Sequence, residues 1–279
     1  MERFGARLRR AIDERGPLCV GIDPHPSLLT AWGVGDDIEG LRRFCDIAIE
    51  AFADLVAVVK PQSAFFERFG YAGIGILEST IRQLRTGGSL ALLDVKRGDI
   101  GSTMAAYADA YLDQRRPLSA DAITVTPYLG FGSLRPVIDM ALSNGAGVFV
   151  VTLTSNPEGA VVQQARQGDG RTVAQTIIDE IAQVNAGVAP LGDIGAVIGA
   201  TLGGDGSEPV ADLAKINGPM LAPGLGAQGG RPEDLRRIFG DDLHSVLPSY
   251  SREILARGPD VTALRDAVRE ALDSVRAAM

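Results

Sequence analysis

The sequence predicts a single (β/α)8 barrel of the TIM-barrel class, spanning residues 1–279, with an extra helix ahead of the first strand. Three observations predict this fold. Eight short apolar runs recur along the chain, amphipathic segments separate them, and no linker or change of composition divides the chain. Eight strand–helix units in about 250 residues match the usual size of such a barrel. A doubly wound open sheet is the competing arrangement.

The apolar runs have the character of buried parallel strands. Each is four to seven residues long and apolar nearly throughout, with no alternation of polar side chains. Such runs suit strands that are covered on both faces. The eight runs are residues 18–23, 55–60, 90–96, 122–126, 147–152, 194–200, 220–223 and 244–248.

Helical spacing marks the segments between the runs. Residues 38–55 and 261–275 carry apolar side chains three or four positions apart, as an amphipathic helix requires. The same spacing within residues 4–12 predicts the extra N-terminal helix. Residues 155–171 are rich in glycine and polar side chains, which predicts a long loop after the fifth strand, and loops of that length usually are functional or disordered.

Charge and composition exclude several classes of protein. Lys and Arg number 27 against 35 Asp and Glu, a formal charge of −8. We therefore expect no nucleic acid and no anionic membrane as a partner, although a local cluster of cations could still bind a small anion. The sequence contains no run of about 18 apolar residues, the length that is needed to span a bilayer. The charged N-terminal residues are unlike a secretory signal. We expect a cytoplasmic protein.

The sequence offers little material for a metal site or a disulfide. Cys19 and Cys45 lie far apart inside apolar runs, which argues against a disulfide framework and against a cysteine-based zinc site. The histidines are His25 and His244. His25 stands between two prolines and is interpreted as a rigid turn residue, with a catalytic base as the alternative. His244 is interpreted as a structural residue at the start of the eighth strand.

Charged side chains collect at the ends of the predicted strands. Asp23 ends the first run, Lys60 ends the second and Asp94 and Lys96 end the third, while Ser155 follows the fifth. In a barrel the carboxyl ends of the strands build the active site. Because only three residues of the chain are lysine, a lysine at such a position points to function.

Asp94-Val95-Lys96 is the most informative segment. The two-residue period of a strand puts Asp94 and Lys96 on the same face, toward the barrel mouth, and Val95 on the other. Since a buried charge costs several kcal/mol unless it is paired, we expect Lys60, Asp94 and Lys96 to neutralise one another. A buried ion pair that fixes strand register is the alternative. A lysine beside carboxylates is held protonated, which suits a proton donor at a developing carbanion, with carbon dioxide as the leaving group.

The glycine-rich segment 224–230 indicates a phosphate site. It fits the GxGxxG pattern of dinucleotide-binding folds, but the strand that follows lacks the acid that binds ribose there. In a barrel, loops after the seventh and eighth strands commonly bind phosphate through backbone N–H groups, and Arg252 would add a cation. Tyr250 is interpreted as a packing residue, with a contact to the phosphate as the alternative. The simpler alternative is an ordinary glycine-rich turn beside a surface arginine.

These residues together resemble a known family. The stretch 94–103 is similar to the DxKxxD motif of orotidine 5'-phosphate decarboxylases, and the segments 21–23, 59–61, 155–157 and 223–230 follow in that family's order. The similarity covers nearly the whole chain. The length and the run 60–67 resemble the longer bacterial branch of the family.

The resemblance implies a role for each candidate residue. Lys96 would protonate C6 of the pyrimidine as carbon dioxide leaves, without cofactor or metal, in a homodimer that binds a nucleotide substrate. The remaining roles it implies are a charged tetrad completed by Lys60, Asp94 and Asp99, with Asp99 reaching the neighbouring subunit's site; ribose contacts from Asp23, Lys60 and, across the interface, Thr103; a pyrimidine contact from Ser155; a bridge from base to phosphate at Gln228; and phosphate binding by Arg252.

Two departures from the family pattern and two alternatives accompany this assignment. Ser251 stands where shorter relatives have glycine, and Glu158 is an extra residue before Gly159. Another sugar-phosphate barrel, such as a hexulose-phosphate synthase or a keto-gulonate-phosphate decarboxylase, would share DxKxxD but would generally use magnesium and lack Lys60. A barrel that only binds a sugar phosphate would gain nothing from an acid beside its ligand.

Overall fold

The structure is a computed structural model that describes residues 1–202 and 211–279. Eight parallel strands follow one another in chain order around a closed barrel, and β8 pairs with β1. The predicted (β/α)8 barrel is confirmed, and the open doubly wound sheet is excluded because the last strand closes on the first. The strands are β1 (Cys19–Ile22), β2 (Val58–Pro61), β3 (Leu90–Arg97), β4 (Ala122–Val125), β5 (Gly147–Leu153), β6 (Ile194–Ile198), β7 (Met220–Pro223) and β8 (Val246–Tyr250).

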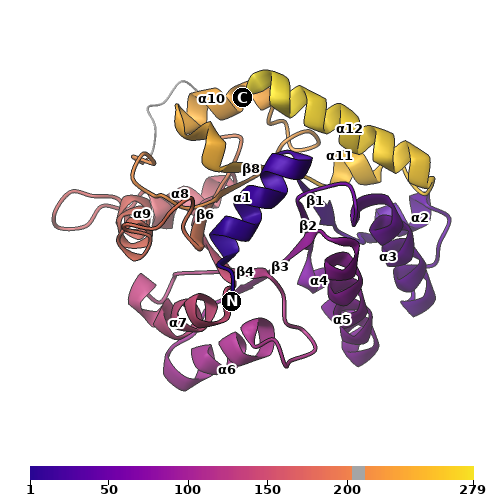
Figure 1. The fold of residues 1–279 in the computed structure, drawn as a ribbon, viewed down its shortest axis with the longest axis horizontal. Helices are drawn as coiled ribbons and strands as arrows, with labels where there is room; N and C mark the ends of the chain where they lie inside the picture. Colours follow the sequence, from indigo (N-terminus) through magenta and orange to yellow (C-terminus); the bar gives the residue numbers. More distant parts are fainter. Residues whose placement is uncertain (203–210) are drawn as a thin grey trace.

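Helices surround the strands, as Figure 1 shows. The α-helices are α1 (Phe4–Arg15), α2 (Pro26–Ala31), α3 (Ile38–Phe52), α4 (Ser63–Glu67), α5 (Gly70–Gly87), α6 (Gly101–Leu112), α7 (Arg135–Asn144), α8 (Ala160–Gln163), α9 (Val173–Val184), α10 (Pro232–Phe239), α11 (Arg252–Leu255) and α12 (Val261–Ala278). Short 3-10 helices are η1 (Phe131–Leu134), η2 (Pro157–Gly159) and η3 (Asp242–Ser245).

Alternation along the strands divides the apolar side chains between two cores. On β1, Val20 and Ile22 belong to the core between strands and helices, whereas Cys19 belongs to the core inside the barrel. On β3, Leu93 faces the helices and Leu92 faces the barrel interior. Both faces of each strand are therefore buried, which explains why the strands are apolar without alternation.

The N-terminal helix α1 closes one end of the barrel. Its apolar residues Phe4, Leu8 and Ile12 pack into the inner core, and the Phe4 ring meets the Phe149 ring of β5 edge-on at 6.0 Å. In Figure 1, α1 crosses in front of the strands while the other long helices lie around them. Because α1 covers the end at which the strands begin, only the carboxyl ends are left to build a site.

The structure departs from the predicted elements most clearly in three places. His244 lies in η3, so β8 begins at Val246 and the interpretation of His244 as a strand residue is wrong. The second strand begins at Val58, three residues later than predicted. The predicted loop 155–171 contains η2 and α8. The Gln163 Oε1 accepts a hydrogen bond from the backbone N–H of Thr154, and its Nε2 donates one to the Thr154 hydroxyl. These two bonds fix a helical turn against the end of β5.

Within residues 1–202 and 211–279, no helix combines the length and the apolar character that crossing a membrane requires.

Candidate active site

A cavity of about 200 Å3 opens at the carboxyl ends of the strands. Six of the nine predicted site residues line it: Asp23, Lys60, Asp94, Lys96, Gln228 and Arg252. They come from the ends of β1, β2 and β3, from the loop after β7 and from the first residue of α11. The barrel therefore brings together side chains that are up to 229 residues apart in the chain.

Asp94 is the centre of the site. Lys60 Nζ lies 3.1 Å from its Oδ2, and Lys96 Nζ lies 2.7 Å from Oδ1 and 2.8 Å from Oδ2. The Thr124 hydroxyl donates to Oδ1 at 2.6 Å. The amide of Gln62, oriented with its nitrogen toward the carboxylate, donates to Oδ2 at 2.9 Å. Four donor groups thus converge on one carboxylate and fix its orientation.

The charged array is buried at its base and open at its mouth. Asp94 and Lys60 are each 7% exposed, but the Lys96 side chain is 49% exposed. Val95 points the other way, into the core beneath the helices, as the strand alternation predicts. The Lys96 ammonium therefore rests on a buried carboxylate while one side of it faces the cavity mouth.

Electrostatics keep the buried pair ionised. Burial alone would lower the pKa of Lys60, but the carboxylates of Asp94 and Asp23 outweigh it and raise that pKa. Burial alone would raise the pKa of Asp94, but the ammonium groups of Lys60 and Lys96 hold it well below the usual range. Both groups stay charged at neutral pH, and each depends on the other to remain so in a buried place.

Ser251 has a contact that its position in the sequence did not suggest. Its hydroxyl donates to Asp23 Oδ2 at 2.5 Å, and this contact orients the carboxylate at the end of β1. A Cβ at Gly21 would lie only 2.7 Å from the Ser251 Cβ, so glycine is needed there. Asp23 Oδ1 is buried and has no hydrogen-bond partner in the described part of the chain, which leaves it free to accept one from a ligand hydroxyl.

The loop after β7 has the geometry of an anion cradle. Gly224, Gly226 and Gly229 have φ of 106°, 69° and 92°, which non-glycine residues rarely adopt. The loop is braced by hydrogen bonds from Gly226 N to Gly230 O and from Gly230 N to Gly224 O.

Two N–H groups of this loop are left for a ligand. Within residues 1–202 and 211–279, the backbone N–H groups of Ala227 and Gln228 make no hydrogen bond, and both residues line the cavity together with Arg252. Free amides beside an arginine suit a phosphate.

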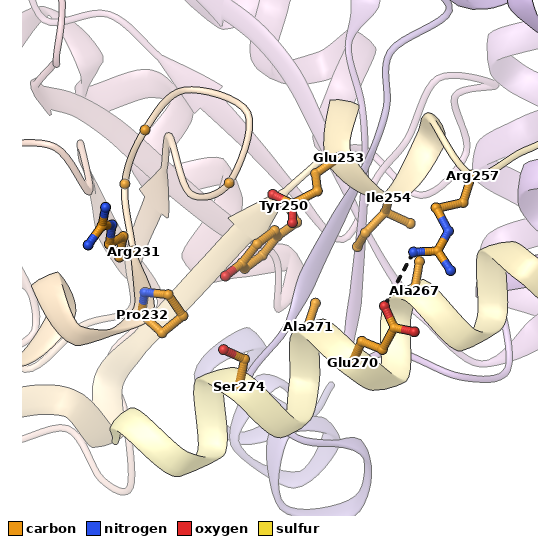
Figure 2. A pocket seen from close by; sticks show the side chains of 13 residues that line it. Arg231, Pro232, Tyr250, Glu253, Ile254, Arg257, Ala267, Glu270, Ala271 and Ser274 are labelled. Atoms are coloured by element: carbon orange, nitrogen blue, oxygen red, sulfur yellow. Dashed lines mark hydrogen bonds and ion pairs between the residues drawn. The ribbon is translucent and has the colours of Figure 1, made fainter.

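Tyr250 lies on the other side of this loop. Figure 2 shows its ring in a second pocket, of about 510 Å3, between the glycine loop and Ala271 and Ser274 of α12. It is not among the residues that line the cavity of Asp94. As the last residue of β8, Tyr250 points outward toward the helices and is 4% exposed in the outer core, which confirms its interpretation as a packing residue; the alternative contact with a phosphate is wrong.

Three predicted site residues do not line the cavity of this chain. Asp99 is partly exposed and accepts a hydrogen bond from the N–H of Ile100 at 2.8 Å. Thr103, in the first turn of α6, is exposed. Ser155 follows β5 and is also exposed. All three lie at the carboxyl ends of their strands, but the structure joins none of them to Asp94 or Lys96.

His25 has a structural role at the start of α2. His25 caps α2, with its Nδ1 accepting from the Ser27 N–H at 3.3 Å, which confirms its interpretation as a turn residue. Among the residues that the structure describes, no group of three or more His, Cys, Asp or Glu side chains is placed to hold a metal ion.

The motifs of the sequence do not indicate the residues that hold the charged groups in place. Thr124 interrupts the apolar run of β4, and a lone hydroxyl in a fully buried strand was an available signal. The position of Gln62, directly after Lys60 and Pro61, is a weaker signal in the sequence. In the sequence, Ser251 stands out only as a departure from the glycine of shorter relatives.

Fold and site together define a (β/α)8-barrel enzyme whose charged groups stand at the carboxyl ends of the strands. Residues 16–267 match the model of the orotidine 5'-phosphate decarboxylase / HUMPS family, and the chain belongs to that family. The enzyme family predicted from the sequence motifs is thus confirmed.

Within this family, the chain is similar to proteins that are named orotidine 5'-phosphate decarboxylase. The chain is 65% identical to an orotidine 5'-phosphate decarboxylase of Salinispora tropica and 59% identical to that of Streptomyces coelicolor, in each case over 100% of this chain and 99% of the relative. A crystal structure from Streptomyces avermitilis, assigned provisionally to the same enzyme, is 57% identical with a TM-score of 0.95 and covers 100% of this chain and 96% of that one.

Proposed function

We propose that the chain decarboxylates orotidine 5'-monophosphate to uridine 5'-monophosphate and carbon dioxide, the last step of de novo UMP synthesis. One observation carries the proposal: a buried carboxylate, Asp94, holds the ammonium of Lys96 at the mouth of a cavity that also contains an anion cradle. The relatives from Salinispora tropica and Streptomyces coelicolor, which are named for this activity, support it.

The reaction needs a proton where a carboxylate departs. The bond between C6 and the substrate carboxylate breaks, its electron pair stays on C6, and carbon dioxide leaves. Lys96 Nζ stabilises the developing charge and donates a proton to C6, and then regains a proton from solvent through its exposed side. Asp94 keeps the amine charged and repels the substrate carboxylate, and the repulsion disappears with the loss of carbon dioxide.

Contacts with the phosphate and the ribose provide the binding energy that holds the substrate carboxylate beside Asp94. Arg252 and the free N–H groups of the glycine loop would bind the phosphate, and Gln228 would bridge the phosphate and the base. Asp23, through its unpartnered Oδ1, and Lys60 would contact the ribose hydroxyls. Ser155 would reach the pyrimidine from the end of β5. Binding energy at the phosphate offsets the repulsion between the substrate carboxylate and Asp94.

We further propose a homodimer that shares its two active sites. Asp99 would complete the partner's charged tetrad and Thr103 would contact the partner's ribose, which fits their exposure in a single chain. Ile100, Tyr128 and Leu129 are 61%, 77% and 53% exposed at the carboxyl ends of β3 and β4. Exposed apolar side chains beside a site are typical of an interface. A cytoplasmic location stays a prediction.

The proposed reaction uses the chain's own residues and no cofactor or metal. The related magnesium-dependent barrels generally lack a lysine at the end of β2, whereas here Lys60 stands there and pairs with Asp94. A site that only bound sugar phosphates would not need the paired acid and ammonium.

The direct test follows the absorbance of orotidine 5'-monophosphate with the purified chain, with and without EDTA. We expect conversion to UMP and carbon dioxide at the same rate in both samples, and the enzyme to sediment as a dimer. Absence of conversion contradicts the proposal. Conversion that stops with EDTA and returns with magnesium favours the magnesium-dependent relatives.

A further inference from the structure

Thr124 occupies a position in the site that none of the motifs indicates. It lies on β4, is 1% exposed, and places its hydroxyl between the backbone of Lys96 and the carboxylate of Asp94. We propose that Thr124 is a positioning residue for decarboxylation, which holds the ammonium of Lys96 and the carboxylate of Asp94 in their relative places. This inference rests on the proposed function.

The backbone at Lys96 needs such support. Its φ is 44°, in the left-handed region that residues with a side chain rarely adopt. The pairing of β3 with β4 skips here, from Leu93 opposite Ile123 to Arg97 opposite Val125. Strained backbone of this kind persists only where surrounding contacts fix it, and it is typical of functional sites.

Thr124 supplies the contact that the skipped pairing leaves out. Its Oγ1 accepts the backbone N–H of Lys96 at 3.0 Å. Without that acceptor the N–H would lack a partner at the point where β3 leaves the regular ladder, and an unsatisfied backbone donor is costly. The hydroxyl thus stabilises the conformation that aims the Lys96 side chain.

The same hydroxyl completes a closed ring of contacts. It donates to Asp94 Oδ1 at 2.6 Å, and that oxygen accepts from Lys96 Nζ at 2.7 Å. A threonine hydroxyl has one hydrogen to donate and lone pairs to accept with, so a single oxygen serves both bonds. One group therefore fixes where the lysine backbone, its ammonium and the carboxylate stand relative to one another.

Thr124 does not line the cavity, and this predicts a characteristic kinetic effect. A residue that touches no substrate but positions the proton donor should affect the chemical step and leave ligand binding unchanged. A misplacement of about 1 Å at a reacting group can cost about 100-fold in rate. Loss of the Thr124 hydroxyl should therefore lower kcat with little change in the affinity for UMP.

A buried threonine on the next strand gives a matched control. Thr152 of β5 is 0% exposed, and its hydroxyl donates to the carbonyl of Val150 in its own strand. The structure joins it to neither Asp94 nor Lys96. Thr152→Val removes a buried hydroxyl from the same barrel and should leave activity unchanged.

The experiment compares Thr124→Val, Thr124→Ser, Thr124→Ala and Thr152→Val in the full-length enzyme. We expect Thr124→Val to lower kcat about 10- to 100-fold, with the Kd for UMP within about twofold of the wild-type value. Thr124→Ser should retain most of the activity. If Thr124→Val fails to fold, Thr124→Ser and Thr124→Ala still differ only in the hydroxyl, and the serine variant should be at least about 10-fold faster.

A double variant tests the route of the effect. Adding Thr124→Val to Lys96→Ala should cause no further loss of turnover, because the lysine that Thr124 positions is already gone. A folded Thr124→Val enzyme with wild-type kcat, equal rates for Thr124→Ser and Thr124→Ala, or a full additional loss in the double variant would each overturn the role of Thr124. A wild-type chain that does not convert orotidine 5'-monophosphate overturns the proposed function instead.

Discussion

Replacing Asp94 by asparagine should destabilise the fold in a way that depends on pH. The substitution removes the charge that faces Lys60, whose side chain is only 9% exposed. The lysine must then stay charged without its main partner or give up its proton. Giving it up costs about 1.4 kcal/mol for each pH unit below its ordinary pKa, or about 4.6 kcal/mol at pH 7. Asp23 still attracts the ammonium, so this is an upper bound, and losses of about 3–5 kcal/mol are usual when a buried pair is broken.

The sign of the pH effect follows from the pKa shifts. In the wild-type protein the pKa of Lys60 is raised. The stabilisation that the charged lysine provides is therefore complete at pH values below the ordinary pKa of lysine. The pKa of Asp94 is lowered, so the stabilisation that its carboxylate provides is complete at pH values above the ordinary pKa of a carboxylate. The pair is therefore intact between about pH 5 and 9. In Asp94→Asn the cost of neutralising Lys60 falls as pH rises, to about 1.9 kcal/mol at pH 9.

Thermal unfolding of both proteins between pH 6 and 9 measures this effect. At about 2 °C per kcal/mol for a chain of this size, Asp94→Asn should lower Tm by about 6–9 °C at pH 7, and the deficit should narrow by pH 9. Asp54→Asn is the control, because Asp54 is 63% exposed and pairs with Arg265 at the surface. Its loss should be about 2 °C or less. A loss of Tm for Asp94→Asn that equals that of the control, or that is the same at every pH, would show that Asp94 does not keep Lys60 charged in the folded protein.

Two further substitutions test the binding of the nucleotide. Arg252→Ala should raise KM strongly for orotidine 5'-monophosphate and should lower kcat/KM much less for orotidine, which lacks the phosphate; equal losses on both substrates would remove the phosphate role. Ser251→Ala removes the hydrogen bond that orients Asp23 Oδ2, and since such a bond to a charged group is worth about 1.5–3 kcal/mol, KM should rise about 10-fold or more with kcat nearly unchanged. An unaltered KM for that variant would show that the Ser251 hydroxyl does not position Asp23 for the substrate.

Much of the fold could be predicted from the sequence because parallel barrel strands leave a strong pattern. Both faces of β1 or β5 are buried, so each strand appears as an uninterrupted apolar run whatever its partners are. The charged ends of β1, β2 and β3 stand out against such runs, which is why Asp23, Lys60 and Asp94 could be identified before the structure was known. The start of β8 was misplaced because the apolar pattern does not separate the turn of η3 from the strand.

The contacts that position the charged groups could not be predicted in the same way. The hydroxyl of Thr124 reaches Asp94 across a strand pairing whose register shifts, and no local pattern specifies that shift. Ser251 meets Asp23 from 228 residues away, through closure of the barrel between β8 and β1. Tyr250 lies one position from Ser251 but faces the opposite side of its strand. Such contacts depend on three-dimensional register, which composition and spacing do not carry.

Proton donation from Lys96 to C6 is the step on which the proposed decarboxylation depends, and the single-turnover rate of Lys96→Ala measures it. The variant should be folded, should bind UMP, and should decarboxylate orotidine 5'-monophosphate at least about 100-fold more slowly than the wild type. Measured beside the UMP affinity, such a loss is assigned to the chemical step and not to binding. A folded Lys96→Ala enzyme that decarboxylates at close to the wild-type rate would show that Lys96 is not the proton donor.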